Sequence, residues 1–436
     1  MSEVAISNNG QMQALILHAY PWWEMQRVRE ISLRSQTPGR HANNAWRHSP
    51  GLIDHTYRGV TTPNCDTLYS GAWLDLADGP ILIDAPATDL PYWSIAVMDL
   101  NTDNIAIMGS SYASSGSLLV CGPNYQGAIP DAMPYVRSAS NVVWLLARYL
   151  IGSDELVAQA EAMRRGVRLL KLPRNANPSE NAASPLRVAL IPAVRKDAAN
   201  FWQIIRNTLD EDSALHRGID APTSVDWDAA WPAGVSDWSG LDAQLQQRFA
   251  EAFAQVVQRI TANNSGNMQT HGQWRYPGAD IGNFGLNAIY RAEVALWGLG
   301  AMPIDEVIYV STFTDDKGAL LQGTHTYRWR IAPQGIPAKA FWSLTMYEVD
   351  PFGGMYFTAN PLKRYAVGDR TTGLIKNPDG SIDIWITHQP PPEPDRQANW
   401  LPAPVGSFRL MIRAYAPTEA FQSAQVAPPA VEIWMD

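Results

Sequence analysis

The stretch that decides the fold reads YSGAWLDL at residues 69–76, PILIDAP at 80–86, YWSIAVMD at 92–99, NIAIMG at 104–109 and SLLVC at 117–121. Each run is short and rich in β-branched, aromatic and other apolar residues. Asp-Gly, Pro and Ser/Gly clusters separate one run from the next. Five strands at such close spacing predict an antiparallel sheet, either a barrel or a sandwich.

The middle of the chain, residues 138–299, has a helical texture instead. The segment SASNVVWLLARYLIG (138–152) begins with Ser and ends with Gly, so we expect a helix there. Further helices are expected at 11–35, with a break or kink at Pro21, and at 153–170, 200–212, 240–262 and 287–300. In 240–262 the apolar residues fall on one stripe that we interpret as core: Leu241, Leu245, Phe249, Phe253, Val256, Val257 and Ile260.

Strand patterns return from Ile304 to the end of the chain. HTYRWRI (325–331) and SFRLMIRAY (407–415) alternate between two faces, as half-buried antiparallel strands do. Asp379-Gly380 indicates a hairpin turn between apolar runs.

The sequence therefore predicts an α+β protein with several domains. Two antiparallel β domains, of barrel or sandwich type and jelly-roll-like, are joined by a helical region. The predicted boundaries are a helical segment at 1–54, a β domain at 55–135, a helical region at 136–300 and a β-sandwich at 301–436.

Composition narrows the function classes. The 436 residues are 46% hydrophobic and carry a formal net charge of -9, which argues against nucleic-acid binding because that needs a basic face. The first residues lack the basic region of a signal peptide, and no apolar run is long enough to span a membrane, so a cytoplasmic protein is expected. Cys65 and Cys121 favour free thiols, with one bridge as the alternative.

Common cofactor motifs are absent from the sequence. There is no glycine-rich nucleotide loop after a strand, no His-Glu-x-x-His, and no pair of histidines at helical ligand spacing. We therefore expect a protein that uses no cofactor and holds no metal.

The most suggestive polar cluster lies in TTPNCDTLYSG, residues 61–71. Pro63 favours an extended conformation at Thr62, and Asn64 and Asp66 suit a turn, so one interpretation is purely structural. The functional interpretation places Asp66 in a cavity above the sheet with Asn64 and Tyr69. A carboxyl group there would have a raised pKa and could act as a general acid or base.

A second cluster places Arg364 among aromatic residues in 342–365. We expect Asp66 and Tyr69 to line a cavity whose far wall includes this stretch, with Arg364 as the charge partner of Asp66. A purely structural arginine is the alternative. The catalytic candidates are Asp66, Tyr69 and Arg364, and the substrate-binding candidates are Asn64, Trp93, Asp99, Asn101, Trp342, Tyr347, Asn360 and Tyr365.

These stretches together resemble a known pair of bacterial families. The pattern from PNCDTLYSGAWLDL (63–76) to the strand that ends in DLNTDN is similar to DUF1254, a domain family of unknown function. RAEVALWGLGAMP, PAKAFWSLTMY, NPLKRYAVGD and NWLPAPVGSFRLMIRAY resemble its usual companion, DUF1214. The resemblance spans about residues 15–435 and implies two β-rich domains joined by a helical region.

Two functions are compatible with these observations. One is a cofactor-free enzyme, a lyase, isomerase or hydrolase, that acts on a partly apolar metabolite between the β domains. Asp66 would then be the acid or base, Tyr69 a donor to developing negative charge and Arg364 the orienting group. The other is a non-catalytic protein that binds a small molecule or carbohydrate. The expected partner is a small molecule, and assembly into a homo-oligomer is left open.

Overall fold

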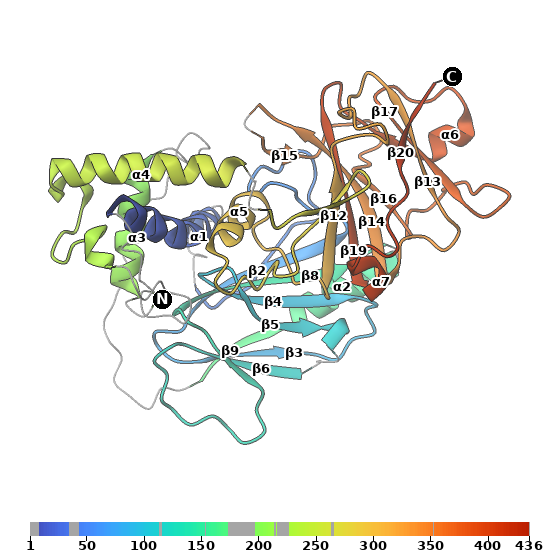
Figure 1. Cartoon of the computed structure of the whole chain (residues 1–436). Coiled ribbons are helices and arrows are strands. Elements are labelled where there is room, and N and C mark those ends of the chain that lie inside the picture. The colour runs from blue at the N-terminus through green and yellow to red at the C-terminus, as the bar shows by residue number, and fades with distance from the viewer. Residues whose placement is uncertain are drawn as a thin grey trace.

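The computed structural model describes residues 8–34, 43–112, 116–152, 154–172, 197–212, 215, 226–262, 266–351 and 353–435. Figure 1 shows an N-terminal β unit, a C-terminal β unit and a group of helices beside them. The predicted α+β class with several antiparallel sheets is confirmed.

The N-terminal β unit consists of two sheets that share one apolar core. The first has the strand order β1-β2-β8-β4-β5 with antiparallel neighbours throughout, and the second has the order β7-β6-β3-β9. Leu74 of β2 and Ile83 of β3 belong to the same buried cluster. The strands are β1 (Arg47–His48), β2 (Thr67–Asp75), β3 (Ile81–Ala85), β4 (Trp93–Asp99), β5 (Asn104–Gly109), β6 (Gly116–Cys121), β7 (Tyr135–Arg137), β8 (Val142–Leu150) and β9 (Arg168–Lys171).

The helix expected at residues 138–152 is wrong, because this segment contains strand β8. The strand lies between β2 and β4 in the middle of its sheet, and both of its faces are covered. A strand buried on both faces is apolar at nearly every position, so its periodicity does not distinguish it from a buried helix. The first β unit therefore extends past residue 135, through β8 and β9.

The C-terminal β unit also contains two sheets around one core. The larger has the order β10-β11-β12-β19-β14-β15 with β16 beside β14, and the smaller has the order β18-β17-β13-β20. The strands are β10 (Gln269–His271), β11 (Trp274–Tyr276), β12 (Val307–Thr312), β13 (Thr326–Ile331), β14 (Ala338–Val349), β15 (Met355–Tyr356), β16 (Ala366–Gly368), β17 (Ile382–Thr387), β18 (Trp400–Pro402), β19 (Phe408–Pro417) and β20 (Val431–Trp434).

The two strands predicted to be half-buried differ in the structure. Strand β13 alternates between buried and more exposed positions, as predicted. Strand β19 is buried at nearly every position, because β12 and β14 flank it and other elements cover both of its faces. Its polar face, with Arg409 and Arg413, is therefore turned toward the interior of the protein.

The helices are α1 (Asn8–Arg34), α2 (Asp154–Gly166), α3 (Ala198–Glu211), α4 (Ala243–Ala262), α5 (Ala288–Trp297), α6 (Pro394–Ala398) and α7 (Glu419–Gln422). Helices α1, α3, α4 and α5 pack on one another, whereas α2 lies against β8 and α6 lies against β17. Helix α1 continues through Pro21, so no break occurs there. The predicted stripe of α4 packs in a cluster with α1 and α3, and Val257 is its one partly exposed member.

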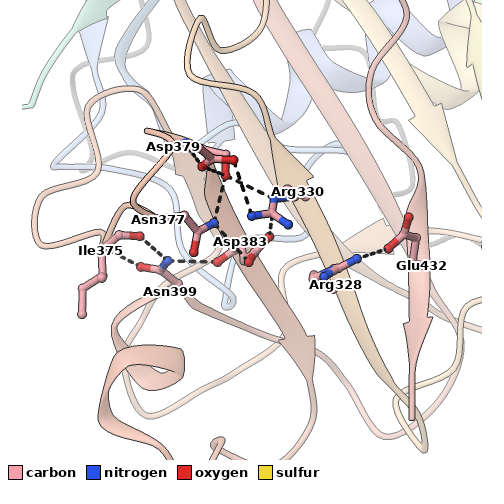
Figure 2. Close-up of polar contacts among 9 residues, drawn as sticks. Arg328, Arg330, Ile375, Asn377, Asp379, Asp383, Asn399 and Glu432 are labelled. Carbon is pink, nitrogen blue, oxygen red and sulfur yellow. Dashed lines mark hydrogen bonds and ion pairs between the residues drawn. The ribbon is translucent and has the colours of Figure 1, made fainter. Parts of the chain in front are cut away.

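Side chains of the smaller C-terminal sheet carry a separate polar network, which Figure 2 shows. The amide of Asn399 donates to the carbonyls of Ile375 and Asp383 and accepts from the Ile375 N–H, so it ties a loop to β17. Arg328 of β13 pairs with Glu432 of β20 across the same sheet. This network has a structural role.

Two further expectations concern bonding and membranes. Cys65 and Cys121 are both free thiols, as favoured by the sequence. Within the described ranges, no helix combines the length and the apolar character that a transmembrane segment requires.

Candidate functional site

A cavity of about 790 Å³ lies between the two β units, and we refer to it as the central cavity. Its volume falls within the range typical of small-molecule sites. Strands β2 and β8 form one wall and strands β12 and β19 form another. Helices α1 and α5, residues 298–301 and most of the segment 47–64 also contribute to the lining.

The wall formed by β2 and β8 follows directly from strand register. Tyr69, Gly71 and Trp73 of β2 pair with Arg148, Leu146 and Trp144 of β8, and all six line the central cavity. Their neighbours along each strand point to the opposite face and enter the core between the sheets. The rings of Trp73 and Trp144 are stacked, with centroids 5.4 Å apart.

The opposite wall contains alternate residues of β19. Arg409, Met411, Arg413 and Tyr415 line the cavity, and Tyr309 of β12 lies beside Arg413 in the sheet. Burial lowers the pKa of Arg409 to about 10 and raises the pKa of Tyr415 well above its ordinary value. Tyr415 is therefore a protonated hydroxyl at neutral pH.

The loop that enters β2 is held in an unusual conformation. Thr62 has a φ of 52°, so the extended conformation expected before Pro63 is wrong. The Thr62 N–H donates to the Met355 carbonyl at 2.8 Å, and the Thr62 carbonyl accepts from Arg413 Nη2 at 2.8 Å. These two hydrogen bonds fix a backbone geometry that a β-branched residue disfavours, next to the cavity.

Asn64 organises the hydroxyl groups of two walls. Its Oδ1 accepts from the Asp66 N–H at 2.8 Å. This bond identifies the oxygen of the side-chain amide, so the other terminal atom is the donor Nδ2. Nδ2 lies 3.2 Å from the Tyr69 hydroxyl and 3.0 Å from the Tyr415 hydroxyl, and it also contacts Thr67. Nδ2 has two protons for these three oxygens, so it positions both tyrosine hydroxyls beside the cavity, and each hydroxyl keeps a proton that it can donate.

Arg148 is the most unusual charged group of the cavity. Its side chain is 5% exposed, and Nη2 donates to the Gly300 carbonyl at 2.8 Å, but Nη1 is buried with no hydrogen-bond partner. Burial alone would lower the pKa of this guanidinium, but electrostatic interactions with Tyr69 and Tyr309 outweigh it and the pKa is raised. Arg148 therefore remains a buried cation.

The structure brings only two of the predicted site residues into the central cavity, Asn64 and Tyr69. Asp66 lines a separate hollow of about 370 Å³ with Arg370. Its expected pairing with Arg364 is wrong: Asp66 accepts from Ser343 Oγ at 2.6 Å and lies 3.5 Å from Arg370. Alternate residues of β2 point to opposite faces, so Asp66 and Tyr69, three positions apart, diverge.

Arg364 and the remaining candidates have other surroundings. Arg364 Nη1 donates to the carbonyls of Ala398 and Trp400, which makes it a brace for β18. The far wall expected from 342–365 is wrong for this cavity, because β12 and β19 occupy that position. The predicted residues that do not line the central cavity are Asp66, Trp93, Asp99, Asn101, Trp342, Tyr347, Asn360, Arg364 and Tyr365.

We expect replacement of Asp66 by asparagine to affect stability rather than a ligand in the central cavity. The change weakens the bond to Ser343 and removes the pairing with Arg370, at a cost of about 1–3 kcal/mol. Urea denaturation measures the loss. Asp78→Asn is the control, because Asp78 and its partner Lys171 are both half-exposed, and it should change stability by less than about 0.5 kcal/mol. An equal effect of both changes would contradict this assignment.

Sequence reasoning missed Arg148, Tyr309, Arg413 and Tyr415. Arg148 was hidden because its strand was predicted as a helix. One signal was present: 142–150 contains valine, tryptophan and tyrosine, which favour strands.

In the part of the chain that the structure describes, no group of three or more His, Cys, Asp or Glu side chains is arranged to hold a metal ion.

Comparisons with known proteins agree with the architecture. Residues 43–171 match the family described as protein of unknown function DUF1254, and residues 306–419 match protein of unknown function DUF1214. No curated protein matches the chain. The crystal structure of the VPA0106 protein from Vibrio parahaemolyticus is similar, with a TM-score of 0.63, 20% identity and coverage of 98% of this chain and 100% of that one. A putative uncharacterized protein from Burkholderia cenocepacia has a TM-score of 0.46 and 14% identity, with coverage of 98% and 94%.

Proposed function

Because the chain belongs to the DUF1254 and DUF1214 families, both described as proteins of unknown function, we propose a function from the central cavity: a cofactor-free enzyme that acts on a partly apolar small molecule. The observation that carries this proposal is the convergence of Tyr69, Tyr415 and Arg148 on one cavity with aromatic walls. A lyase, an isomerase or a hydrolase would fit this arrangement.

The chemistry follows from the character of the polar groups. Tyrosine hydroxyls held by Asn64 are fixed in position, and a buried guanidinium nearby favours negative charge on a bound molecule. Such donors stabilise an oxyanion or enolate that develops during reaction, because they need little reorganisation in a buried site. This arrangement supports a reaction at a carbonyl group or at the carbon beside it.

Two lining residues are candidates for the base. Burial and the nearby charge of Arg164 lower the pKa of His48, so its imidazole is neutral at pH 7 and able to accept a proton. Glu293 of α5 lines the same cavity. These two residues take the place of Asp66 as the proposed base, because Asp66 lines the separate hollow of about 370 Å³ and not the central cavity.

A binding protein without catalysis is the second candidate. It is favoured by the predominance of hydrogen-bond donors in the β walls, which hold an acceptor-rich ligand without removing a proton. Turnover separates the two functions. A metabolite library is incubated with the protein, thermal shift reports binding, and mass spectrometry reports consumption of the compound.

We expect Gly71→Leu to abolish either activity by filling the cavity. A Cβ at Gly71 would meet Trp144 Nε1 at 3.8 Å and the Leu145 carbonyl at 3.9 Å, which are ordinary contacts, so the strand should tolerate it. The rest of the leucine side chain would occupy the ligand space. Binding or turnover should fall at least about tenfold, with the melting temperature nearly unchanged.

The matched control is Gly406→Leu. No atom lies within 4 Å of the position of its Cβ, and Gly406 does not line the cavity. This variant should keep both the ligand-induced thermal shift and any turnover. If Gly71→Leu folds and still binds or consumes the compound normally, the central cavity is not the site.

A further inference from the structure

The central cavity offers an excess of hydrogen-bond donors. Arg148, Trp73 and Trp297 line the cavity, and among the described residues Arg148 Nη1 and the two indole N–H groups are buried without a partner. The hydroxyl oxygens of Tyr69 and Tyr415 lie within hydrogen-bond distance of Asn64 Nδ2, and the Tyr309 hydroxyl accepts from the Met302 N–H at 3.4 Å. Each of these hydroxyls also carries a proton that it can donate. Buried donors are costly when unpaired, so these groups favour a bound molecule that supplies acceptors.

The positively charged side chains of the β walls also favour a ligand that supplies acceptors. The hydrogen bonds of Arg409 and Arg413 go to hydroxyls, a thioether and backbone carbonyls, and within the described part of the chain neither these two guanidinium groups nor that of Arg148 pairs with a carboxylate. Asp66 raises the pKa of Arg413, and the Arg148 charge lowers the pKa of Glu306, so these two cations feel a carboxylate without forming an ion pair. Buried cations that lack a direct ion pair favour a bound anion.

Two carboxylates also line the cavity, on other elements. Asp54 is exposed, and its Oδ1 accepts from the N–H and hydroxyl of Thr56. Glu293 belongs to α5 and has interactions of its own. Neither forms an ion pair with Arg148, Arg409 or Arg413, so the positive character of the β walls remains.

The apolar part of the lining defines the rest of the ligand. Trp73 and Trp144, whose rings stack on each other and are buried, line the cavity together with Leu146, Met411 and Val294. Flat aromatic surfaces favour rings or extended hydrocarbon chains. A volume of about 790 Å³ accommodates such a body together with a charged end group.

We propose that the ligand of the central cavity is an organic carboxylate with an apolar or aromatic body, whose carboxylate lies against Arg148 and the hydroxyls of Tyr69 and Tyr415. This inference rests on the proposed function and specifies its substrate class. Arg148 is a binding residue in this account, and the aromatic end of the ligand lies against Trp73 and Trp144.

The test compares matched charged and neutral probes. Calorimetric titration at pH 8 measures the affinity of 6-phenylhexanoate and of its primary amide, 6-phenylhexanamide, for the parent protein. We expect the carboxylate to bind at least tenfold more tightly than the amide. In Arg148→Met the carboxylate affinity should fall at least tenfold while the amide affinity stays within threefold, so the preference disappears. Arg148→Gln repeats the test if the methionine variant does not fold.

The control arginine, Arg328, does not line the central cavity. Arg328 of β13 packs over the ring of Trp434 with its guanidinium carbon 4.9 Å from the centroid, much as Arg148 lies 5.6 Å from that of Tyr69. Arg328→Met should keep the full preference for the carboxylate. Arg148→Lys should restore part of the preference, because it restores the charge without the planar group.

The outcomes separate this inference from the proposed function. Equal affinity for acid and amide, or a preference that survives in Arg148→Met, overturns the anion assignment but leaves the cavity as a site for neutral ligands. Tight binding of either probe to Gly71→Leu shows that the ligand binds elsewhere and overturns both proposals. Failure of the parent to bind either probe at millimolar concentration also overturns the assignment.

Discussion

Replacing Arg413 by methionine is expected to destabilise the protein by about 2–5 kcal/mol. Arg413 donates to Thr345 Oγ1 at 2.9 Å and to the Thr62 carbonyl at 2.8 Å, and both acceptors would be left unpaired in a buried site. Each unsatisfied buried polar group costs about 1–3 kcal/mol. The change would also release Thr62 from its disfavoured conformation and loosen the loop beside the cavity.

The matched comparison is the same substitution at Arg148, which should change stability by no more than about 1 kcal/mol. Among the described residues Arg148 makes one hydrogen bond, to the Gly300 carbonyl, so fewer buried acceptors lose a partner than at Arg413, and removal of a buried cation lowers the cost further. Urea denaturation of both variants measures the difference. Equal losses at the two positions would contradict the division into a bracing arginine and a ligand-binding arginine.

The second large effect concerns Asp99, and it depends on pH. Asp99 follows the apolar core of β4, and burial raises its pKa to about 7, with Asp103 contributing in the same direction and Arg291 opposing. An acid with a raised pKa in the folded state favours folding at low pH. This contribution is complete below the unfolded pKa of about 4 and is lost as the pH rises to about 7.

We therefore expect Asp99→Asn to gain stability over the parent as the pH rises from 4 to 7, by up to about 4 kcal/mol at 1.36 kcal/mol per pKa unit. His18 works in the opposite direction, because burial lowers its pKa to about 4 and stability is lost as the pH falls from 6.5 to 4. In the parent protein the pH dependences of stability that arise from Asp99 and from His18 partly cancel. In Asp99→Asn only the pH dependence that arises from His18 remains.

Urea unfolding at pH 4.5, 5.5, 6.5 and 7.5 measures this change in slope. Asp78→Asn is again the control, since Asp78 is half-exposed, and its stability curve should run parallel to that of the parent. A constant difference between Asp99→Asn and the parent across this range would show that Asp99 is not the titrating group. Asn101, which contacts Asp99 at 3.4 Å, accepts from the Trp22 indole at 2.7 Å and so holds α1.

The parts of the fold that could be predicted are those with a clear period and clear boundaries. The α4 stripe has helical spacing from Leu245 to Ile260, and β13 alternates between two faces. The segment at 138–152 failed because a strand in the middle of a sheet lacks alternation, and its flanking Ser and Gly also serve as turn residues.

The candidate site was less predictable, because it is assembled from strands that are far apart in the chain. Asn64 and Tyr69 lie in one continuous motif, and local turn chemistry was enough to single them out. Arg413 and Tyr415 lie about 350 positions later, and only the packing of the two β units brings them together with Asn64. An alternating pattern with Arg409 and Arg413 on one face indicates a strand, but it does not reveal that the polar face is buried.

The most direct measurement for this account is a crystal structure of the protein with bound 6-(4-iodophenyl)hexanoate, in which anomalous scattering locates the iodine. We predict the iodine beside the stacked rings of Trp73 and Trp144, and the carboxylate within hydrogen-bond distance of Arg148 and of the Tyr69 or Tyr415 hydroxyl. A ligand that binds outside the central cavity, or a carboxylate that points away from Arg148, would contradict it.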